Sequence, residues 1–535
     1  MWLHRGPPPA PVPGTAADDR DMKRMGKIQK LNRIYTVSTL VGYGVILGMT
    51  WPFSLMRSTH STGTLSLTNG GPAGAIWVYL GTCVGMSTVV ISMAELASIE
   101  PTTGGQYHWV SIFAPPKYRK ILSYMVGWLC SLGWQSGVAG SANVGALSIQ
   151  GFIKVANSDY NPKSWHIVLL TIAILCFVVF FNTVLSRKLP GIEGVIFILY
   201  LLGFVVFLVV FFVMGDRSPA REVFTNFQDN AGWGSIGTAC FVSISGPVIT
   251  VIGSDSAVHL AEELKDASRQ LPKAMLFMAF TNYFLGFVML LAFVFVVGNV
   301  EEVLATPTGQ PYIQVIWNAT QSRGPTIALV AIIIFFFLFT AVNVNTTASR
   351  QIWAFARDGG LPFSPWINYV SPYLHIPVNA VLLSWFIGCC IALVPLGSNA
   401  AFLNIQTIGN GGLLSSYILC ITCRLYHRNA ISVYGNLVKR PTFCLGKIAG
   451  NIVNCFALCF LIIFLVAGMF PVAPNPTTET MNWTCTALGA TVIIALLLFI
   501  QLGKGYLGAR AETLPESERV SESEETELEN KAFDA

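Results

Sequence analysis

The sequence Gly-Ser-Asp-Ser-Ala-Val-His-Leu-Ala-Glu-Glu occupies residues 253–263, at the end of a long apolar stretch. Asp255 is therefore expected at bilayer depth, where a carboxylate costs at least about 2.5 kcal/mol and normally faces a cavity or a partner. Gly253 and Ser254 loosen a helix at this point. A loosened membrane helix with a buried acid is typical of a binding site for a small polar solute.

The composition places the whole chain in the membrane. Its 535 residues are 53% hydrophobic and only 11% charged, with a mean hydropathy of +0.59. Soluble domains carry about 25% charged residues, so we expect an all-α integral membrane protein. The apolar segments are long enough to cross a hydrocarbon core of about 30 Å as helices. Twelve spans are predicted, at residues 36–59, 73–98, 121–150 (strongly tilted), 165–185, 192–214, 237–261, 274–298, 325–349, 377–396, 400–423, 448–470 and 484–503.

The distribution of basic residues predicts the orientation of these spans. Of the 32 Lys and Arg residues, only six fall in the loops that would be outside if the N-terminus is cytoplasmic. This asymmetry predicts that both termini are cytoplasmic. Two glycosylation sequons, at Asn318 and Asn482, fall in the predicted outside loops. A third, at Asn345, lies within a span and is discounted.

The two ends of the chain differ in composition from the rest. Residues 1–35 are rich in proline and charge and are expected to form a disordered cytoplasmic tail, with the first span serving as the targeting element. Residues 36–503 form the transmembrane domain. Residues 504–535 are acidic and are expected to be a solvated cytoplasmic tail. Either tail could also dock a regulatory partner.

Small residues interrupt the first and the sixth span near their middles. Gly42-Tyr43-Gly44 and Gly48 lie in the first span, and Gly246-Pro247 and Gly253-Ser254 lie in the sixth. Paired interruptions indicate an inverted repeat of five plus five spans, followed by two more, with a site at the midplane. The exposed end of a half-helix attracts a carboxylate or an ammonium, depending on its polarity. Close helix packing is the other explanation for such glycines.

Several acids near the spans are candidates for carrying a proton. Asp255, His259 and Glu262 or Glu263 would share one face of an α-helix, and histidine titrates near pH 6–7. The two glutamates are equally explained as the cytoplasmic end of the span. Glu193 is a further candidate for carrying a proton. Glu193 and Glu95 could also latch an inner gate by pairing with arginine, or form structural ion pairs.

Other classes of function lack their motifs. The chain has no GxxxxGK[ST] segment, no HExxH and no paired Cys/His set, so we expect no nucleotide, no metal, no cofactor and no enzymatic activity. It also has no basic patch interleaved with aromatic residues, so no nucleic acid is expected as a partner.

Four blocks of sequence carry a resemblance to a known family. They are 94–110 (AELASIEPTTGGQYHWV), Gly127-Trp128 with Gly133-Trp134-Gln135, 253–272, and 348–362 (ASRQIWAFARDGGLP). Together they resemble the amino acid–polyamine–organocation (APC) superfamily of transporters, and most closely its fungal GABA and choline permease branch. The resemblance covers roughly residues 30–505.

This resemblance implies a leucine-transporter (LeuT)-like fold and proton-coupled import of an amino acid, GABA, choline or a related amine at the plasma membrane. It also implies a substrate site lined by Gly42, Tyr43, Gly44, Gly253, Ser254, Asp255, Trp134 and Gln135. Ser254 stands where relatives usually carry an aromatic residue, and Trp51-Pro52 replaces a common acidic position, so the substrate could be bulkier than GABA or choline. Efflux, a vacuolar membrane and a nutrient sensor that does not transport remain alternatives.

Overall fold

The computed structural model describes residues 10–55, 67–430, 441–478 and 480–503, together with residues 505, 506 and 508. Its twelve membrane-crossing segments follow the predicted order: α2 with α3 (Val37–Gly48, Thr50–Leu55), α5 (Gly71–Ile99), α7 (Arg119–Ala156), α8 (Ser164–Thr183), α9 (Leu189–Met214), α11 with α12 and η2 (Ile236–Ser243, Ser245–Val251, Ser254–Glu263), α13 (Ala267–Val296), α16 (Arg323–Arg357), α18 (Val378–Ala392), α19 (Asn399–Ala430), α20 (Lys447–Ala467) and α21 (Thr484–Leu502).

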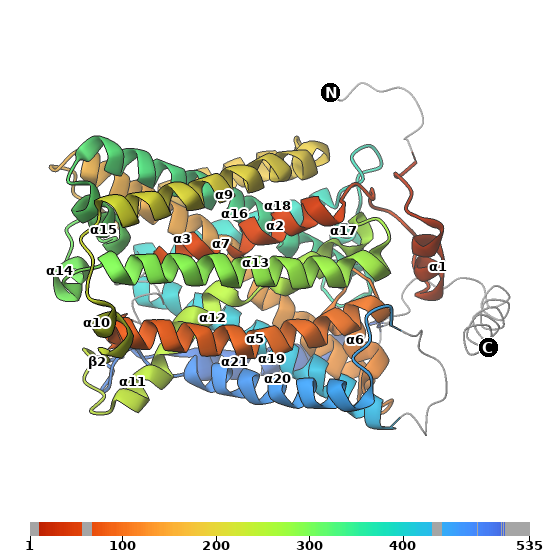
Figure 1. Ribbon diagram of the computed structural model, residues 1–535. Helices are drawn as coiled ribbons and strands as arrows, with labels where there is room; N and C mark the ends of the chain where they lie inside the picture. Colours follow the sequence, from red (N-terminus) through yellow and green to blue (C-terminus); the bar gives the residue numbers. More distant parts are fainter. Residues whose placement is uncertain are drawn as a thin grey trace, which may run out of the picture.

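Short elements connect these segments at the two ends of the bundle. They are α1 (Ala16–Arg24), α6 (Gln106–Phe113), α10 (Ala220–Thr225), α14 (Val300–Leu304), α15 (Pro311–Thr320), α17 (Ser364–Ile367), η1 (Ser186–Lys188), η3 (Val394–Leu396), and the strands β1 (Asn69–Gly70) and β2 (Gln228–Asp229), which pair antiparallel. Figure 1 shows α1, α6 and α17 at one end, called the α1 end below, and β2, α10, α14 and α15 at the other, called the β2 end.

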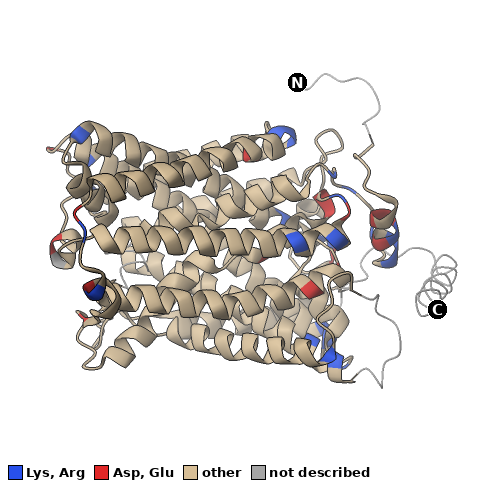
Figure 2. Ribbon diagram, in the orientation of Figure 1, with Lys and Arg blue, Asp and Glu red and all other residues tan. Residues whose placement is uncertain are grey.

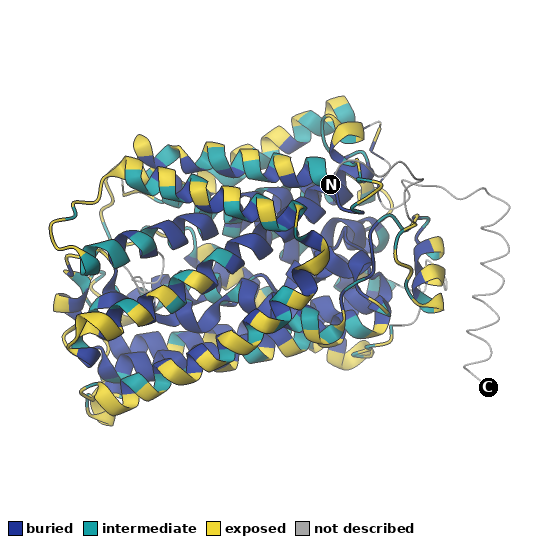
Figure 3. Ribbon diagram, turned by 90° about the horizontal axis from the view of Figure 1, so that it is seen from above, coloured by how far each residue is buried: buried dark blue, intermediate teal, exposed yellow. Residues whose placement is uncertain are grey.

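The middle of the bundle is almost free of charge, and the charged residues gather at the two ends (Figure 2). Nine helices in the described part of the chain are long and apolar enough to cross a membrane on their own. α13 and α16 are the most central of these. In each of them 61% of the most apolar 18-residue stretch is buried, against 6% in α21. Buried residues fill the interior, and exposed ones face outward along the peripheral helices (Figure 3).

The first and the sixth crossing segments are both broken. α2 ends at Gly48, and Met49 adopts a left-handed conformation (φ 48°) before α3 begins. α12 ends at Val251, and Gly253 (φ 98°) precedes the 3₁₀ helix η2. The two breaks are five spans apart, as expected for two halves of five spans each.

The expectation of a disordered N-terminal tail is wrong for residues 10–35. Thr15 caps α1, and Asp18 then accepts hydrogen bonds from the backbone N–H groups of Asp266 and Ala267 at the start of α13. Arg33 lies 3.3 Å from Asp18 and donates to the carbonyl oxygens of Ala261 and Leu264. Charges that predicted a solvated tail are therefore satisfied by partners far away in the sequence. Residues 1–9 and the acidic residues of the C-terminal tail lie outside the described residues.

Candidate functional site

Asp255 lies at the start of η2, directly after the second break, and is fully buried. Its carboxylate accepts three hydrogen bonds from three different elements. Gln106 Nε2 on α6 lies 2.6 Å from Oδ2, Trp134 Nε1 on α7 lies 3.3 Å from Oδ2, and the Tyr417 hydroxyl on α19 lies 2.5 Å from Oδ1. The resemblance suggested Trp134 as a neighbour, whereas the sequence did not single out Gln106 or Tyr417.

His259 is placed to share a proton with Asp255. Its Nδ1 lies 2.9 Å from the carbonyl oxygen of Thr103, which can only accept, so Nδ1 carries hydrogen. Its Nε2 lies 3.6 Å from Asp255 Oδ2 and becomes a second donor only when the ring is protonated. The expected shared face of an α-helix is wrong in detail because η2 is a 3₁₀ helix, yet the two side chains still meet.

Three other acids named from the sequence are also buried and are paired with arginine. Glu262 receives two bonds from Arg357, at 2.8 and 2.9 Å. Glu263 lies 2.8 Å from Arg350, and Glu95 pairs with Arg424 and Arg428.

Asp255 and Glu193 have no such arginine or lysine partner among the described residues. Glu193 is fully buried on α9, and the one hydrogen bond its side chain accepts comes from Asn343 Nδ2, 3.0 Å away. These two acids are therefore the buried carboxyl groups that are free to exchange a proton or to meet a cation.

A cavity of about 10 Å³ lies between the two breaks, enough for roughly one water molecule. The predicted residues Gly44, Gly253 and Ser254 line it, together with Gly48, Thr250, Val251, Ile252, Met278, Asn282 and Tyr283. A substrate-sized solute does not fit, so the structure represents a closed conformation around the breaks.

α13 supplies polar groups that satisfy the broken backbone. Asn282 Nδ2 donates to the carbonyl oxygen of Gly44 at 3.2 Å, and the Tyr283 hydroxyl donates to that of Val251 at 3.2 Å. Val251 is the last residue of α12, so its carbonyl group is released by the break and needs such a partner inside a membrane, whereas Gly44 lies one turn before the end of α2. An asparagine–tyrosine pair within an otherwise apolar span was the sequence signal that could have identified α13.

Three of the predicted site residues point away from this cavity. α2 continues through Gly42 and Gly44, and the break follows Gly48, about one turn later. Gly42 packs against α9, where an added Cβ would lie 3.1 Å from Phe197. The Tyr43 hydroxyl binds Asn343 O and Thr347 on α16, and Gln135 donates to Ser384 on α18.

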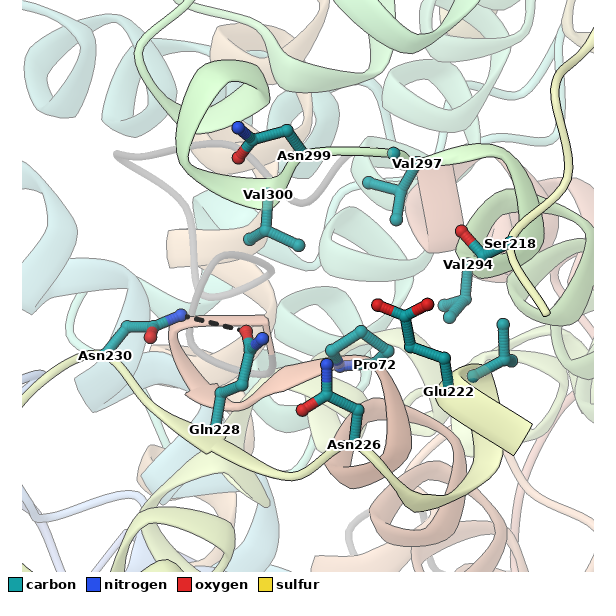
Figure 4. A pocket seen from close by; sticks show the side chains of 12 residues that line it. Pro72, Ser218, Glu222, Asn226, Gln228, Asn230, Val294, Val297, Asn299 and Val300 are labelled. Atoms are coloured by element: carbon teal, nitrogen blue, oxygen red, sulfur yellow. Dashed lines mark hydrogen bonds between the residues drawn. The ribbon is translucent and has the colours of Figure 1, made fainter. Parts of the chain in front are cut away.

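A larger cavity, of about 220 Å³, lies at the β2 end between the start of α5, α10 and the α13–α14 connection. Figure 4 shows its one carboxylate, Glu222, among the side-chain amides of Asn226, Gln228, Asn230 and Asn299. It contacts neither break. The small cavity is therefore the better candidate for a midplane site.

A family model described as "Amino acid permease" matches residues 37–495. The chain belongs to the amino acid permease family. This match covers both breaks and every predicted site residue, and members of the family are membrane transporters of amino acids or related amines.

Individual relatives resemble this permease over most of its length. A choline transporter of Saccharomyces cerevisiae is 27% identical over 522 residues, covering 96% of this chain and 90% of that protein. An amino-acid permease of Arabidopsis thaliana is 28% identical over 500 residues, covering 89% and 92%. A Macrophomina phaseolina protein, provisionally named as an amino acid/polyamine transporter, is 30% identical over 425 residues, covering 78% and 92%.

The fold agrees with that of a solved transporter. The Eremococcus coleocola manganese transporter superposes with a TM-score of 0.51 at 12% identity, covering 94% of this chain and 98% of the other. At this identity the likeness concerns the fold alone. It confirms the predicted arrangement of two five-span halves for this permease.

Proposed function

We propose that this permease moves an amine-bearing solute across the membrane by alternating access, with the positive charge of the solute held near Asp255. One observation carries the proposal: the second helix break places Asp255, which has no arginine or lysine partner in the described part of the chain, next to the cavity that Ser254 lines. The names of the relatives, a choline transporter and amino-acid permeases, agree with a substrate of this class.

The polarity of the breaks supports a cation. Both α2 and α12 end at the cavity, through Gly48 and Val251. Each helix C-terminus carries about half a negative charge from its unpaired carbonyl groups. A substrate carboxylate, where there is one, would be met by the N–H groups at the start of η2. Glycine at 253 allows close approach to that backbone.

Transport is proposed to be coupled to protons, carried by the Asp255–His259 pair or by Glu193. The basic residues of the predicted inside loops lie at the α1 end, so that end is proposed to be cytoplasmic, with the protein working as an importer at the plasma membrane. Efflux, a vacuolar location and sensing without transport are the competing proposals.

Uptake of a panel of labelled amines in a transport-deficient cell tests the proposal. The panel should include choline, GABA, a polyamine and a basic amino acid, each measured at acidic and neutral external pH. Asp255→Asn is expected to lower uptake of the transported amine at least about tenfold, since it removes a charge-assisted interaction of about 1.5–3 kcal/mol. Glu222→Gln, in the larger cavity, is the matched control and should leave uptake unchanged.

Each competing proposal has its own outcome in that assay. Saturable binding with no uptake would favour a sensor, and loss of preloaded amine from the cell would favour efflux. Unchanged uptake in Asp255→Asn would contradict the role of the acid.

Glycosylation tests the proposed orientation. Both sequons lie at the β2 end, but Asn482 Nδ2, the atom that would carry a glycan, donates to the carbonyl oxygens of Gly468 and Phe470 at 2.8 and 2.9 Å. In Asn318 it is the side-chain oxygen, Oδ1, that accepts a hydrogen bond, from Gln314 Nε2. We therefore expect the larger glycan-dependent gel shift to disappear in Asn318→Gln. Labelling of this loop by a reagent delivered to the cytoplasm would contradict the orientation.

A further inference from the structure

Gln106 connects the buried acid to the α1 end of the bundle. It is the first residue of α6 and is fully buried. Its Nε2 lies 2.6 Å from Asp255 Oδ2, and its Oε1 has no hydrogen-bond partner in the described structure. The side chain is thus held through a single bond, and that bond is to the acid beside the helix break.

The loop that carries Gln106 packs tightly on η2. The backbone N–H of Thr103 donates to Glu262 Oε1 at 3.3 Å, and the carbonyl oxygen of Thr103 accepts from His259. Gly105 (φ 55°) lies so close that an added Cβ would be 3.1 Å from Val258. These contacts hold the loop against η2 at the α1 end. The hydrogen bond from Gln106 is the further contact between this loop and η2, and it is the one made to Asp255.

An arriving cation must compete for the same carboxylate. Asp255 already accepts three neutral donors, and a carboxylate has about four acceptor positions. A hydrogen bond from a charged donor is roughly twice as strong as one from a neutral amide. Gln106 donates to the same oxygen, Oδ2, as Trp134, and it comes from a short connecting element, whereas Trp134 comes from a long packed helix.

We propose that Gln106 is a positioning residue that holds Asp255 toward α6 in the empty, closed state and is displaced when the substrate cation binds. Loss of this bond frees the loop from η2 and opens the α1 end. The inference rests on the proposed function, because it requires that Asp255 meets the substrate.

A native cysteine provides the readout. Cys130 is fully buried on α7, about one turn nearer the α1 end than Trp134. In full-length protein that retains Cys130 as its only cysteine, the rate of modification by a membrane-permeant maleimide reports opening of this end. The parent should react slowly and should react faster when the transported amine is added.

Gln106→Leu should make Cys130 react faster without any amine. Losing one hydrogen bond to a carboxylate corresponds to a change of at least about tenfold, and added amine should produce little further increase. The KM for the amine should fall by a similar factor while the maximal rate decreases, because the acid is released for the cation but the closed state is less populated. A purely structural role would lower the maximal rate alone.

Two further variants isolate the bond. Gln310→Leu is the matched control: Gln310 is a buried glutamine immediately before α15 at the β2 end, and its loss should leave the reactivity of Cys130 unchanged. Asp255→Ala should raise that reactivity as Gln106→Leu does. The double variant should react no faster than Asp255→Ala alone, since that variant has already lost the Gln106–Asp255 bond.

The proposal is overturned if Gln106→Leu reacts at the parent rate, or if the two substitutions add. Gln106→Asn, whose shorter amide cannot span the same distance, is expected to behave like Gln106→Leu and serves if the latter does not reach the membrane. If the parent transports no amine, the proposed function fails, but the maleimide rates in the absence of amine still test the Gln106–Asp255 bond.

Discussion

Glu193 on α9 accepts a hydrogen bond from the side-chain amide of Asn343 on α16, over 3.0 Å. The same amide nitrogen lies 3.2 Å from the carbonyl oxygen of Tyr43 on α2. Asn343 therefore connects a buried acid to the first broken span. Tyr35 and Tyr43 are the titratable groups near this acid, and Arg350 on α16 and Glu263 on η2 lie near the same two tyrosines. Arg350 is bound to Glu263, so Glu193 has no cation of its own among the residues that the structure describes.

Glu193→Gln tests whether this acid carries the coupled proton. Glutamine keeps the size of the side chain and can still accept from Asn343, so the fold should be preserved. We expect exchange of amine across the membrane to continue, whereas accumulation driven by an acidic exterior should be lost. Uptake measured at external pH 5 and 7.5 checks this. Tyr43→Phe, which leaves the Asn343–Glu193 bond intact, should retain the pH dependence. A Glu193→Gln variant that still accumulates amine in acid would leave Asp255–His259 as the proton carrier.

Gly253→Ala tests the second break. At φ 98° a side chain is strained whatever the space around it, at a cost of about 1–3 kcal/mol. The nearest atom to an added Cβ is Leu47 Cδ2 at 3.5 Å, so the effect would come from the backbone and not from a clash. We expect a lower melting temperature and reduced uptake. Gly81→Ala, on α5 with no atom within 4 Å of the new Cβ, should show neither effect.

Arg357→Ala tests the buried ion pair near the α1 end. Both Arg357 and Glu262 are buried, and removing one partner leaves an uncompensated charge, at a cost of about 3–5 kcal/mol. Thermal unfolding in detergent should show strong destabilisation. The double change Glu262→Gln with Arg357→Met should recover much of the loss, because both charges of the pair are then removed together. A single variant as stable as the parent would rule out a structural role for the pair.

Acid should release α1 from the bundle. Burial would raise the pKa of Glu100, but the guanidinium of Arg24 outweighs it and lowers the pKa to about 2. Burial likewise opposes ionisation of Asp18, and Arg33 with the backbone N–H of Ala267 lowers its pKa below the ordinary value. A carboxyl group whose pKa is lowered in the docked state stabilises the docking of α1 at pH values above its ordinary pKa, which is 4.5 for Glu100. This contribution is lost as the pH falls toward 2.

A spin label at Lys23→Cys, in a chain without other cysteines, should therefore become mobile between about pH 4.5 and 2. Glu100→Gln should raise its mobility at pH 7 and weaken the transition. A label that stays equally immobile down to pH 2 would show that these two carboxylates do not hold α1.

Hydropathy predicted the spans well because each needs about 20 apolar residues whatever its neighbours are. The second break was predicted at Gly253, where only glycine adopts the required φ without strain. In the first span the break follows Gly48, one of the interrupting residues named from the sequence, whereas α2 remains helical through Gly42 and Gly44, because glycine permits an interruption without requiring one.

The partners of Asp255 could not be derived from local sequence. Gln106 and Tyr417 lie 149 and 162 residues away, and only the folded bundle brings them together. Gln106 was inside a block that carried the family resemblance, yet nothing in that block indicated contact with the acid. The order of residues 10–35 was missed for the same reason, since Asp18 and Arg33 are satisfied by the start of α13 and the end of η2.

The most direct test concerns the cavity between the two breaks. Ser254→Cys is nearly isosteric and places a thiol in the lining of that cavity. In a chain with no other cysteine, the transported amine should slow modification of this thiol by a small methanethiosulfonate, with half-protection near the KM for uptake. If saturating amine leaves the modification rate unchanged while the variant still transports it, the substrate does not bind between the broken spans.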